Sequence, residues 1–437
     1  MTYIPKERRS ILSSEARIQA PWIKVVIGKY TFGVFSKSQG SSKTDNGFYS
    51  SYNAYNVQFP NYVKSLTIQK INGQVNQYTL NIVYPVRVGD DPNFFEKVFS
   101  SVSKSRKIVF TYGDAAMPSY IYKDEEAIIT KVSSSFGFGA GGSSNSVINY
   151  TVSAVSTATL GKTGSYTFMG GHIKPSEKIK DMFRNTNYGL QSLFTGMRES
   201  NLADLIAGDD MEVDVETKMN TTPLDYITYL VSCMIPSGST AGARSKSIYI
   251  LTIHDDTIYD QLYGNESLGG PYFKVTKISY DKKYTDAYEV DIGYNTNTIV
   301  TNFGINQNEN YSILYDYQSE LHPEEYVRRI NDQGKLEDIF APSFTSNNEH
   351  RITRPEDITW YTKLTKYPIS GSITIQGLLR PAMLMTYLRL NVIFPGARKH
   401  ISSGLYIVTS QQDQIDESGY RTTLGITRID GDDTLET

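Results

Sequence analysis

Hydrophobic and polar residues alternate along much of this chain, a period of two that is typical of β-strands with one buried face. In the clearest stretch, residues 66–84, two alternating runs flank the dipeptide Asn72-Gly73. Asn-Gly between such runs favours a type I′ turn, because both central residues of that turn need a positive φ. The pattern therefore predicts a β-hairpin whose apolar face covers a core.

Other alternating or apolar runs predict a chain rich in strands, at 22–28, 30–35, 108–112, 373–378 and 391–394. A weakly repeated strand–turn–strand unit occurs at 127–155, 272–292 and 405–429, through duplication or chance similarity. The three units predict long antiparallel hairpins. Gly404 and Gly425 lie next to or inside predicted strands, where glycine is typical of bulges or tight corners.

Helical periodicity is concentrated in the middle of the chain. The strongest pattern predicts a helix over 223–235, with Thr222 as its N-cap and Pro223 as its first residue. Further helices are predicted at 94–99, 176–185, 190–206 and 323–330. The order of elements is β, then α, then mixed, then β, which indicates a β-rich α+β protein.

Composition narrows the classes of function. A net charge of −3 and a pI of about 6.0 argue against a dedicated nucleic-acid binder, although a passive wall around DNA stays compatible with them. The single cysteine, Cys233, cannot form an intrachain disulfide and suits a reducing compartment. We expect no signal peptide and no membrane span, because no apolar run approaches about 20 residues.

Candidate catalytic and metal-binding groups are sparse. The five histidines have no metal-ligand spacing, and His254-Asp255-Asp256 is the one His/carboxylate cluster, which a strand end followed by a solvated turn explains equally well. The glycine-rich stretch 139–142 lacks the Lys-Ser/Thr of a phosphate-binding loop and predicts a flexible hairpin tip. Cys233 lies in an apolar run, which predicts a buried side chain.

Carboxylates occur in adjacent pairs, which are typical of solvated turns or helix N-termini. The pairs are Asp90-Asp91, Glu125-Glu126, Asp209-Asp210, Asp255-Asp256, Glu324-Glu325 and Asp432-Asp433. A glycosidase needs two carboxylates that converge across a cleft, which sequence neighbours do not provide. We therefore expect a protein that is not an enzyme, with no catalytic, cofactor-binding or metal-binding residues.

The C-terminal segment carries a family resemblance. Residues 404–429, "GLYIVTSQQDQIDESGYRTTLGITRI", resemble the closing hairpin of phage tail baseplate hub proteins, a family related to type VI secretion spike hubs and tail late-control proteins. The matching residues are Ile415, Asp416, Gly419, Tyr420, Thr422, Leu424 and Ile426. The segment 387–408 is similar to the preceding strand and turn, the segments 114–137 and 147–156 to the hairpin of a first barrel, and 221–234 to a connecting helix.

The resemblance implies two antiparallel β-barrel domains with a helical and mixed α/β insertion. The implied divisions are an N-terminal arm (1–20), a first hub barrel (21–165), a helical connector (166–240), a mixed α/β domain with an extended connection (241–365) and a second hub barrel (366–437). The Asn-rich stretch 295–365 departs from the family pattern, so earlier segments are candidates to complete the second barrel.

The implied function is that of a structural hub subunit in a virion tail, assembled in the cytoplasm of a bacterial host. Three chains with two barrels each would form a homotrimeric, pseudo-sixfold ring between a sixfold tail tube and a threefold spike. The implied partners are the tube or its initiator protein, the central spike and other baseplate proteins. DNA or tape-measure protein would only pass through the lumen.

Two other functions stay open from the residues. Thirty-three tyrosines and several polar loops are compatible with a receptor- or glycan-binding tail-tip protein. A cell-wall hydrolase that uses Asp255 or Glu126 has less support, because neither residue belongs to a recognisable catalytic pattern.

Overall fold

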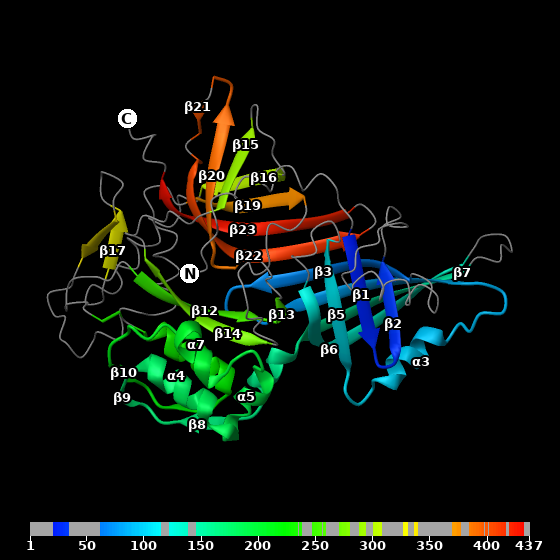
Figure 1. Ribbon diagram of the computed structural model, residues 1–437, viewed down its shortest axis with the longest axis horizontal. Coiled ribbons are helices and arrows are strands. Elements are labelled where there is room, and N and C mark those ends of the chain that lie inside the picture. The colour runs from blue at the N-terminus through cyan, green and yellow to red at the C-terminus, as the bar shows by residue number, and fades with distance from the viewer. Residues whose placement is uncertain are drawn as a thin grey trace.

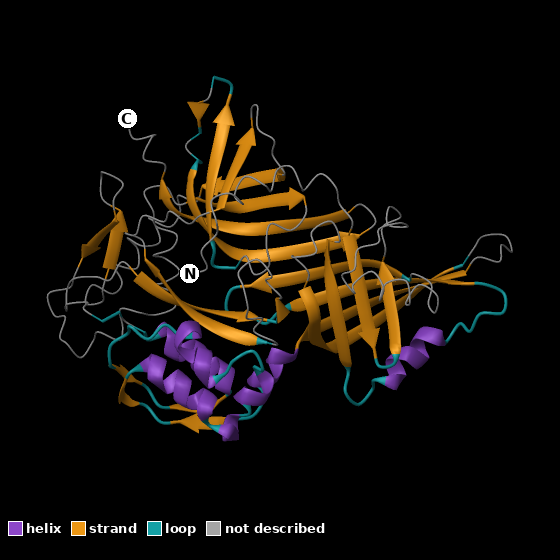
Figure 2. Cartoon of the chain, in the orientation of Figure 1, coloured by secondary structure: helices purple, strands orange, loops and turns teal. Residues whose placement is uncertain are grey.

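A computed structural model gives the fold, which is dominated by antiparallel strands with a small helical unit at one side (Figure 2). This confirms the predicted β-rich α+β class. The structure describes residues 21–34, 62–114, 122–138, 146–234, 236–237, 247–255, 257–258, 271–279, 288–293, 300–307, 327–330, 336–339, 369–376, 384–396, 398–400, 402–416 and 419–431. The predicted arm 1–20, the loop 36–56 and the glycine-rich stretch 139–142 lie outside these residues.

One sheet of 15 strands runs through the described part of the chain in the order β16-β19-β23-β22-β3-β4-β7-β6-β5-β1-β2, with β13, β15, β20 and β21 beside this path (Figure 1). Its first half consists of β1 (Pro21–Ile27), β2 (Tyr30–Val34), β3 (Val63–Ile71), β4 (Gln77–Val86), β5 (Lys107–Asp114), β6 (Tyr122–Gly137) and β7 (Ser146–Ser156). Within the described pairings the path stays open, but β2 lies beside β3, so the first half curls round its own core.

The first core follows from the alternation in the sequence. Leu66, Ile68, Leu80 and Ile82 are all fully buried. The polar residues between them lie on the opposite face of the sheet and are less buried. Helix α3 (Phe94–Ser101) closes one end of this core with Phe95. The short helix is amphipathic, and its buried residues Phe95 and Val98 lie three positions apart, on one face.

The turn between β3 and β4 differs from the predicted type I′. The amide of Gln74 donates to the carbonyl of Ile71 over 3.0 Å, and Gly73 has a φ of 70°. Asn72 has no positive φ, so the turn is of type II. The physical reason is tertiary: the amides of Asn72 and Gly73 donate to Thr409 (3.2 Å) and Leu251 (3.1 Å) of two other strands, and five residues rather than two connect the strands.

The second half of the sheet contains segments far apart in sequence. Its strands are β15 (Tyr288–Gly293), β16 (Val300–Gln307), β19 (Ile369–Gln376), β20 (Tyr387–Phe394), β21 (Arg398–Lys399), β22 (Gly404–Asp416) and β23 (Gly419–Gly431). β15 pairs in parallel with β20, whereas β16 pairs antiparallel with β19. Both earlier segments therefore extend the sheet that the C-terminal strands build.

The β22–β23 hairpin joins the two halves. Residues Ser410–Ile415 of β22 pair with Leu66–Ile71 of β3, so the sheet continues without interruption. Ile415 and Tyr420, at the tip of the hairpin, belong to the first core. Leu424 and Ile426, further along β23, belong to the core of the second half. One hairpin thus supplies buried side chains to both cores.

The helical unit lies beside this sheet. It contains α4 (Pro175–Arg184), α5 (Leu190–Leu193), α6 (Leu202–Leu205), α7 (Pro223–Ser232), the 3-10 turns η4 (Thr157–Lys162), η5 (Thr186–Tyr188) and η6 (Glu199–Asn201), and the short strands β8 (Tyr166–Phe168), β9 (Gly171–Ile173), β10 (Val213–Val215) and β11 (Lys218–Thr221). A ribbon of β12 (Ser247–His254) and β14 (Tyr272–Ser279) packs into the same core (Figure 1).

Helix α7 confirms the predicted start at Thr222. The Thr222 hydroxyl accepts from the amide of Asp225 over 3.3 Å, and Pro223 occupies the first turn. The predicted helix over 190–206 is wrong as a single element, because the chain breaks after α5. There the amide of Gly196 donates to the carbonyl of Pro271, while Phe194 and Met197 turn into the core.

Two further predictions of local structure are wrong. Residues 323–330 were expected to form a helix, but Val327–Ile330 is strand β17, paired with β18 (Leu336–Ile339). Branched Val327 and Ile330 suit a strand. The repeat unit over 272–292 is not a hairpin, because β14 pairs with β12 and β15 with β20. The units at 127–155 and 405–429 do form antiparallel hairpins.

Gly304 on β16 and Gly371 on β19 lie opposite each other's strand and differ in the space around them. A Cβ at Gly371 would lie 2.2 Å from the backbone oxygen of Gly304, whereas a Cβ at Gly304 would meet nothing within 4 Å. Since backbone cannot yield as a side chain can, we expect Gly371→Ala to destabilise this part of the sheet by about 1–3 kcal/mol. Gly304→Ala should be neutral or slightly stabilising. Urea unfolding of both variants checks this; equal midpoints would contradict it.

Candidate functional site

The candidate site of this protein is a buried polar junction where the two halves of the sheet and the β12–β14 ribbon meet. The charged side chains in it are Lys70, Glu125, Asp255 and Asp413, each at most 3% exposed. Buried charges at this level are rare unless they are paired or hydrogen-bonded. We use the name polar junction for these four residues and their hydrogen-bond partners.

Glu125 is the centre of the junction. The Tyr78 hydroxyl donates to Glu125 Oε2 over 2.8 Å, and the Tyr112 hydroxyl lies 3.0 Å from both carboxylate oxygens. Lys70 Nζ lies 3.5 Å from Glu125 Oε1 and 5.9 Å from the centre of the Tyr112 ring. Because β3, β4, β5 and β6 each contribute one of these residues, the carboxylate ties four strands together.

Asp255 brings the β12–β14 ribbon into the junction. It follows directly after β12, and its Oδ1 accepts from the Ser156 hydroxyl at the end of β7. Its Oδ2 lies 3.3 Å from the Tyr78 hydroxyl. Burial, reinforced by the nearby Glu125 and Asp255 carboxylates, raises the pKa of Tyr78 well above its usual value. Tyr78 therefore stays protonated and is able to donate at neutral pH.

Asp413 brings the second half of the sheet into the junction. Its Oδ1 accepts from the Thr422 hydroxyl over 2.8 Å, and its Oδ2 accepts from the Gln411 side-chain amide over 2.8 Å. It lies opposite Ile68 in the register of β22 on β3. Burial raises the pKa of the Asp413 carboxyl, and the positive charge of Lys70 opposes this rise.

The raised pKa of Asp413 predicts a pH-dependent stability. The folded protein binds this proton more tightly than the unfolded chain, whose pKa is about 3.9. The stabilisation is complete below about pH 4 and is lost as the pH rises through the raised pKa. We expect the free energy of unfolding to fall with rising pH above about 4 more steeply in the wild type than in Asp413→Asn, measured by urea unfolding at several pH values.

Asp91→Asn is the control for this prediction. A hydrogen bond from Lys97 lowers the pKa of the exposed Asp91, so Asp91 titrates below the window in question. This variant should follow the pH slope of the wild type. Parallel curves for the wild type and Asp413→Asn would contradict the assignment.

The carboxylates of the junction link neighbouring strands through hydrogen bonds. These carboxylates are buried, and they accept hydrogen bonds from hydroxyl groups on β4, β5 and the end of β7 and from a hydroxyl and an amide group of the β22–β23 hairpin. Glu125 and Asp255 therefore hold together segments that are distant in sequence, whereas the hydrogen bonds of Asp413 stay within its own hairpin. Among the described residues, no group of three or more His, Cys, Asp or Glu residues could hold a metal ion.

The residues weighed for hydrolysis have separate roles. Asp255 is 1% exposed and belongs to the junction, whereas Glu126 faces the opposite side of β6 from Glu125 and forms an ion pair with Lys107 at 2.5 Å. His254 is buried, lies 2.8 Å from the Thr252 hydroxyl and stacks on Tyr272. Asp256 lies outside the described residues. The structure does not place Glu126 in one site with Asp255.

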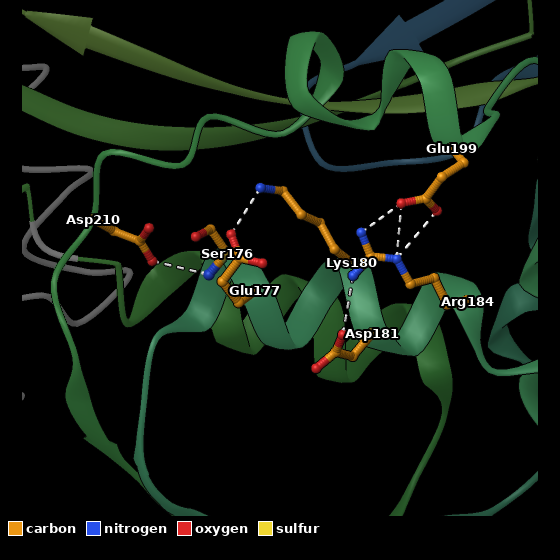
Figure 3. A network of polar contacts seen from close by, with 7 residues as sticks. All are labelled: Ser176, Glu177, Lys180, Asp181, Arg184, Glu199 and Asp210. Atoms are coloured by element: carbon orange, nitrogen blue, oxygen red, sulfur yellow. Dashed lines mark hydrogen bonds and ion pairs between the residues drawn. The ribbon is translucent and has the colours of Figure 1, made fainter.

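The Asp209-Asp210 pair contacts α4 through Asp210 (Figure 3) and the β12–β14 ribbon through Asp209. Asp210 Oδ2 accepts from the amide of Ser176 over 2.9 Å, which supplies a cap to the N-terminus of α4 from a distant segment. Asp209 accepts from the Tyr249 hydroxyl over 2.7 Å and pairs with Lys277. Asp210 is buried and lies outside any helix, so it is neither in a solvated turn nor in the first turn of a helix of its own; it reaches the N-terminus of a helix 34 residues away.

Exposed ion pairs line the outer face of α4 in the same view. Arg184 pairs with Glu199 at 2.6 Å and with Asp181 at 3.2 Å, while Lys180 donates to Glu177 over 2.9 Å (Figure 3). The hydrogen bond and charge of Arg184 lower the pKa of Glu199. Pairs this exposed are typical of a solvated helix surface. Cys233 is 7% exposed, as the apolar run predicted, and burial raises the pKa of its thiol.

Sequence reasoning missed the junction, although a signal for it exists. Lys70 continues the inward row of Leu66 and Ile68, and Asp413 lies two residues before the buried Ile415. A charged residue at an inward position of an alternating strand indicates a buried, paired charge. Glu125 was noted only as a member of a carboxylate pair, although it precedes the buried Ala127 and Ile129 by two and four residues.

Comparison with known proteins gives matches at the level of structure. No protein-family model and no curated protein matches the sequence. A tail protein from Neisseria meningitidis MC58 matches with 10% identity and a TM-score of 0.46, over 93% of this chain and 96% of that one. The 43 kDa tail protein of prophage MuSo2 from Shewanella oneidensis matches with 9% identity and a TM-score of 0.47, over 94% and 100%.

A third match is a component of the type VI secretion system from Escherichia coli, with 10% identity and a TM-score of 0.41, over 84% of this chain and 74% of that one. No helix in the described part of the chain has the length and apolar character needed to cross a membrane. Two tail proteins and a type VI secretion component are thus among the solved structures that this chain resembles.

Proposed function

We propose that this protein is a structural subunit of a phage-type tail, and that three copies form a pseudo-sixfold hub ring between the tail tube and the central spike. The observation that carries the proposal is the edge-to-edge fusion of two mainly antiparallel β units, each with its own core, through the pairing of β22 with β3. The hairpin resemblance over 404–429 agrees with it.

The joining of two β units in one chain suits a protein that connects a sixfold structure to a threefold one. A chain with two β units presents six such units when three copies surround an axis, while its repeat as a chain stays threefold. One face of the ring then offers six similar surfaces, and the other offers three distinct ones. A sixfold tube and a threefold spike would each find a matching partner.

The polar junction supports the same role. A ring that bears load needs a constant angle between its β units. The hydrogen bonds of Asp255 tie the ribbon to the first half of the sheet, and the charge of Lys70 on β3 acts on Asp413 on β22. Because buried polar networks have strict geometric requirements, they favour one arrangement over many.

We also propose the binding partners of the protein and its location. The partners are a second and third copy of this chain, the tube or its initiator, the spike and other baseplate proteins, with DNA or tape-measure protein passing through the lumen. We place the protein in the virion tail, after assembly in the bacterial cytoplasm. The division into two hub barrels, a connector and a mixed domain belongs to this proposal as well.

Negative-stain electron microscopy of the purified full chain, alone and mixed with its cognate tube protein, tests the proposal. We expect rings with threefold order and six peripheral densities. A monomer in both samples that binds glycans on an array would support the tip-protein alternative instead. Peptidoglycan turnover lost in Asp255→Asn or Glu126→Gln would support a hydrolase, and either result would overturn the hub assignment.

A further inference from the structure

The β6–β7 hairpin ends in an arm with an open edge. β5 pairs with β6 only as far as Ile128, and the amide of Ile129 then donates to Arg106. Arg106 has a φ of 50°, which turns the chain away from β6. After a bulge at Thr130, β6 pairs with β7 from Lys131 to Gly137 on one side and, among the described residues, with no strand on the other. The arm extends beyond the rest of the sheet in Figure 1.

The open edge carries an apolar row that continues the first core into solvent. Val132 and Phe136 pair with Val152 and Ile148 of β7, whose side chains are buried. Cross-strand partners share one face of a sheet. Val132 is nevertheless 38% exposed and Phe136 60% exposed, and Phe138 follows at 81%. A strand laid beside the arm, with apolar residues on the same face, would cover this row.

The edge also has little of the usual protection against pairing. Natural edge strands are guarded by charged residues, proline or short length. The eight residues from Thr130 to Gly137 include one charge, Lys131, and no proline. An edge of this length and composition is a template for an added strand. The arm therefore has the properties of a strand-binding surface.

β16 has the matching properties at the other end of the sheet. Within the described pairings, it bonds to β19 on one side only. It spans eight residues, Val300–Gln307, with no charge and no proline, and its alternate residues Phe303 and Ile305 pack on the core of the second half. Figure 1 shows β16 far from the arm, so one molecule cannot pair the two.

We infer that the arm of one copy pairs with β16 of the next copy and continues the sheet from molecule to molecule. Equal length, absence of opposing charge and the alternating apolar rows make β16 the fitting occupant. The contact is heterologous, with different surfaces on the two copies, so it closes into a ring when its rotation permits. The inference rests on the proposed ring and deepens it by naming the surfaces in contact.

Cysteine cross-linking of the full chain tests this contact. In a Cys233→Ser background, Ser133→Cys marks the arm and Asn302→Cys marks β16, and both positions are exposed. With a short bismaleimide, the double variant should give a ladder of covalent multimers, and an equal mixture of the single variants should give dimers. Each single variant alone should stay monomeric. Dimers from Ser133→Cys alone would show arm-to-arm pairing and overturn the inference.

Two further variants separate this inference from the proposed function. Val132→Lys with Phe136→Lys should abolish the cross-link, because two lysines would be buried in the new pair of strands. Val88→Lys, at a position 92% exposed in the turn after β4, should leave the cross-link intact. Rings in electron micrographs without an arm–β16 cross-link would overturn the contact and leave the hub role standing. Absence of both rings and cross-link would overturn both.

Discussion

Replacement of Lys70 by alanine should destabilise the protein by about 3–5 kcal/mol, because it removes the cation beside a fully buried carboxylate. Lys70 is 3% exposed, and its ammonium lies 3.5 Å from Glu125 Oε1. Without it, Glu125 has to stay charged in a poorly solvated place or take up a proton. Urea unfolding followed by circular dichroism at pH 7 would measure the loss.

The control is an exposed ion pair between β5 and β6. Glu126, next to Glu125, pairs with Lys107 on the solvent side at 2.5 Å, with both side chains nearly half exposed. Lys107→Ala should therefore cost at most about 1 kcal/mol. The double variant Lys70→Met, Glu125→Gln should lose less than the sum of its single changes, because it removes both charges. Similar losses for Lys70→Ala and Lys107→Ala would refute the role given to the polar junction.

Phe95→Ala should have an effect of similar size, about 3–5 kcal/mol, through loss of buried contacts and the cavity left behind. Phe95 and Val98 are the two buried residues of α3, and the ring of Phe95 is fully buried. Its centroid lies 5.3 Å from those of Phe32 and Tyr150, and 5.5 Å from that of Tyr84. Thermal and urea unfolding would measure the change, and hydrogen exchange in α3 should rise with it.

Phe138→Ala is the matched control, since it removes the same side chain from a position that is 81% exposed. It should leave the unfolding midpoint unchanged within experimental error. If hydrogen exchange in α3 were equal in the wild type and in Phe95→Ala, the helix would be held by other contacts, and the role assigned to Phe95 would be wrong.

Strands with one clear apolar face were predictable from the sequence. The alternation over 66–84 places Leu66, Ile68, Leu80 and Ile82 inward, and the structure buries all four. The N-cap of α7 was equally predictable, because Thr222 and Pro223 act within one turn of chain. Such features depend on residues a few positions apart, so a single sequence contains the whole signal.

Features that need distant segments were not predictable in this way. The parallel pairing of β15 with β20 joins residues a hundred positions apart, which no local period reveals. The break after α5 follows from the hydrogen bond of Gly196 to Pro271, and the turn at Asn72 takes its form from Thr409 and Leu251. In each case tertiary contacts override a reasonable local preference.

The sequence by itself determined that this protein is a β-rich α+β chain with inward apolar rows and a buried Cys233. Only the tertiary structure decided that Lys70, Glu125, Asp255 and Asp413 meet, and that β22 and β3 join two β units into one sheet. The physical reason is that the alternation of apolar and polar residues along a strand specifies which face is buried. The choice of partner strand depends instead on which edges and charges meet in space.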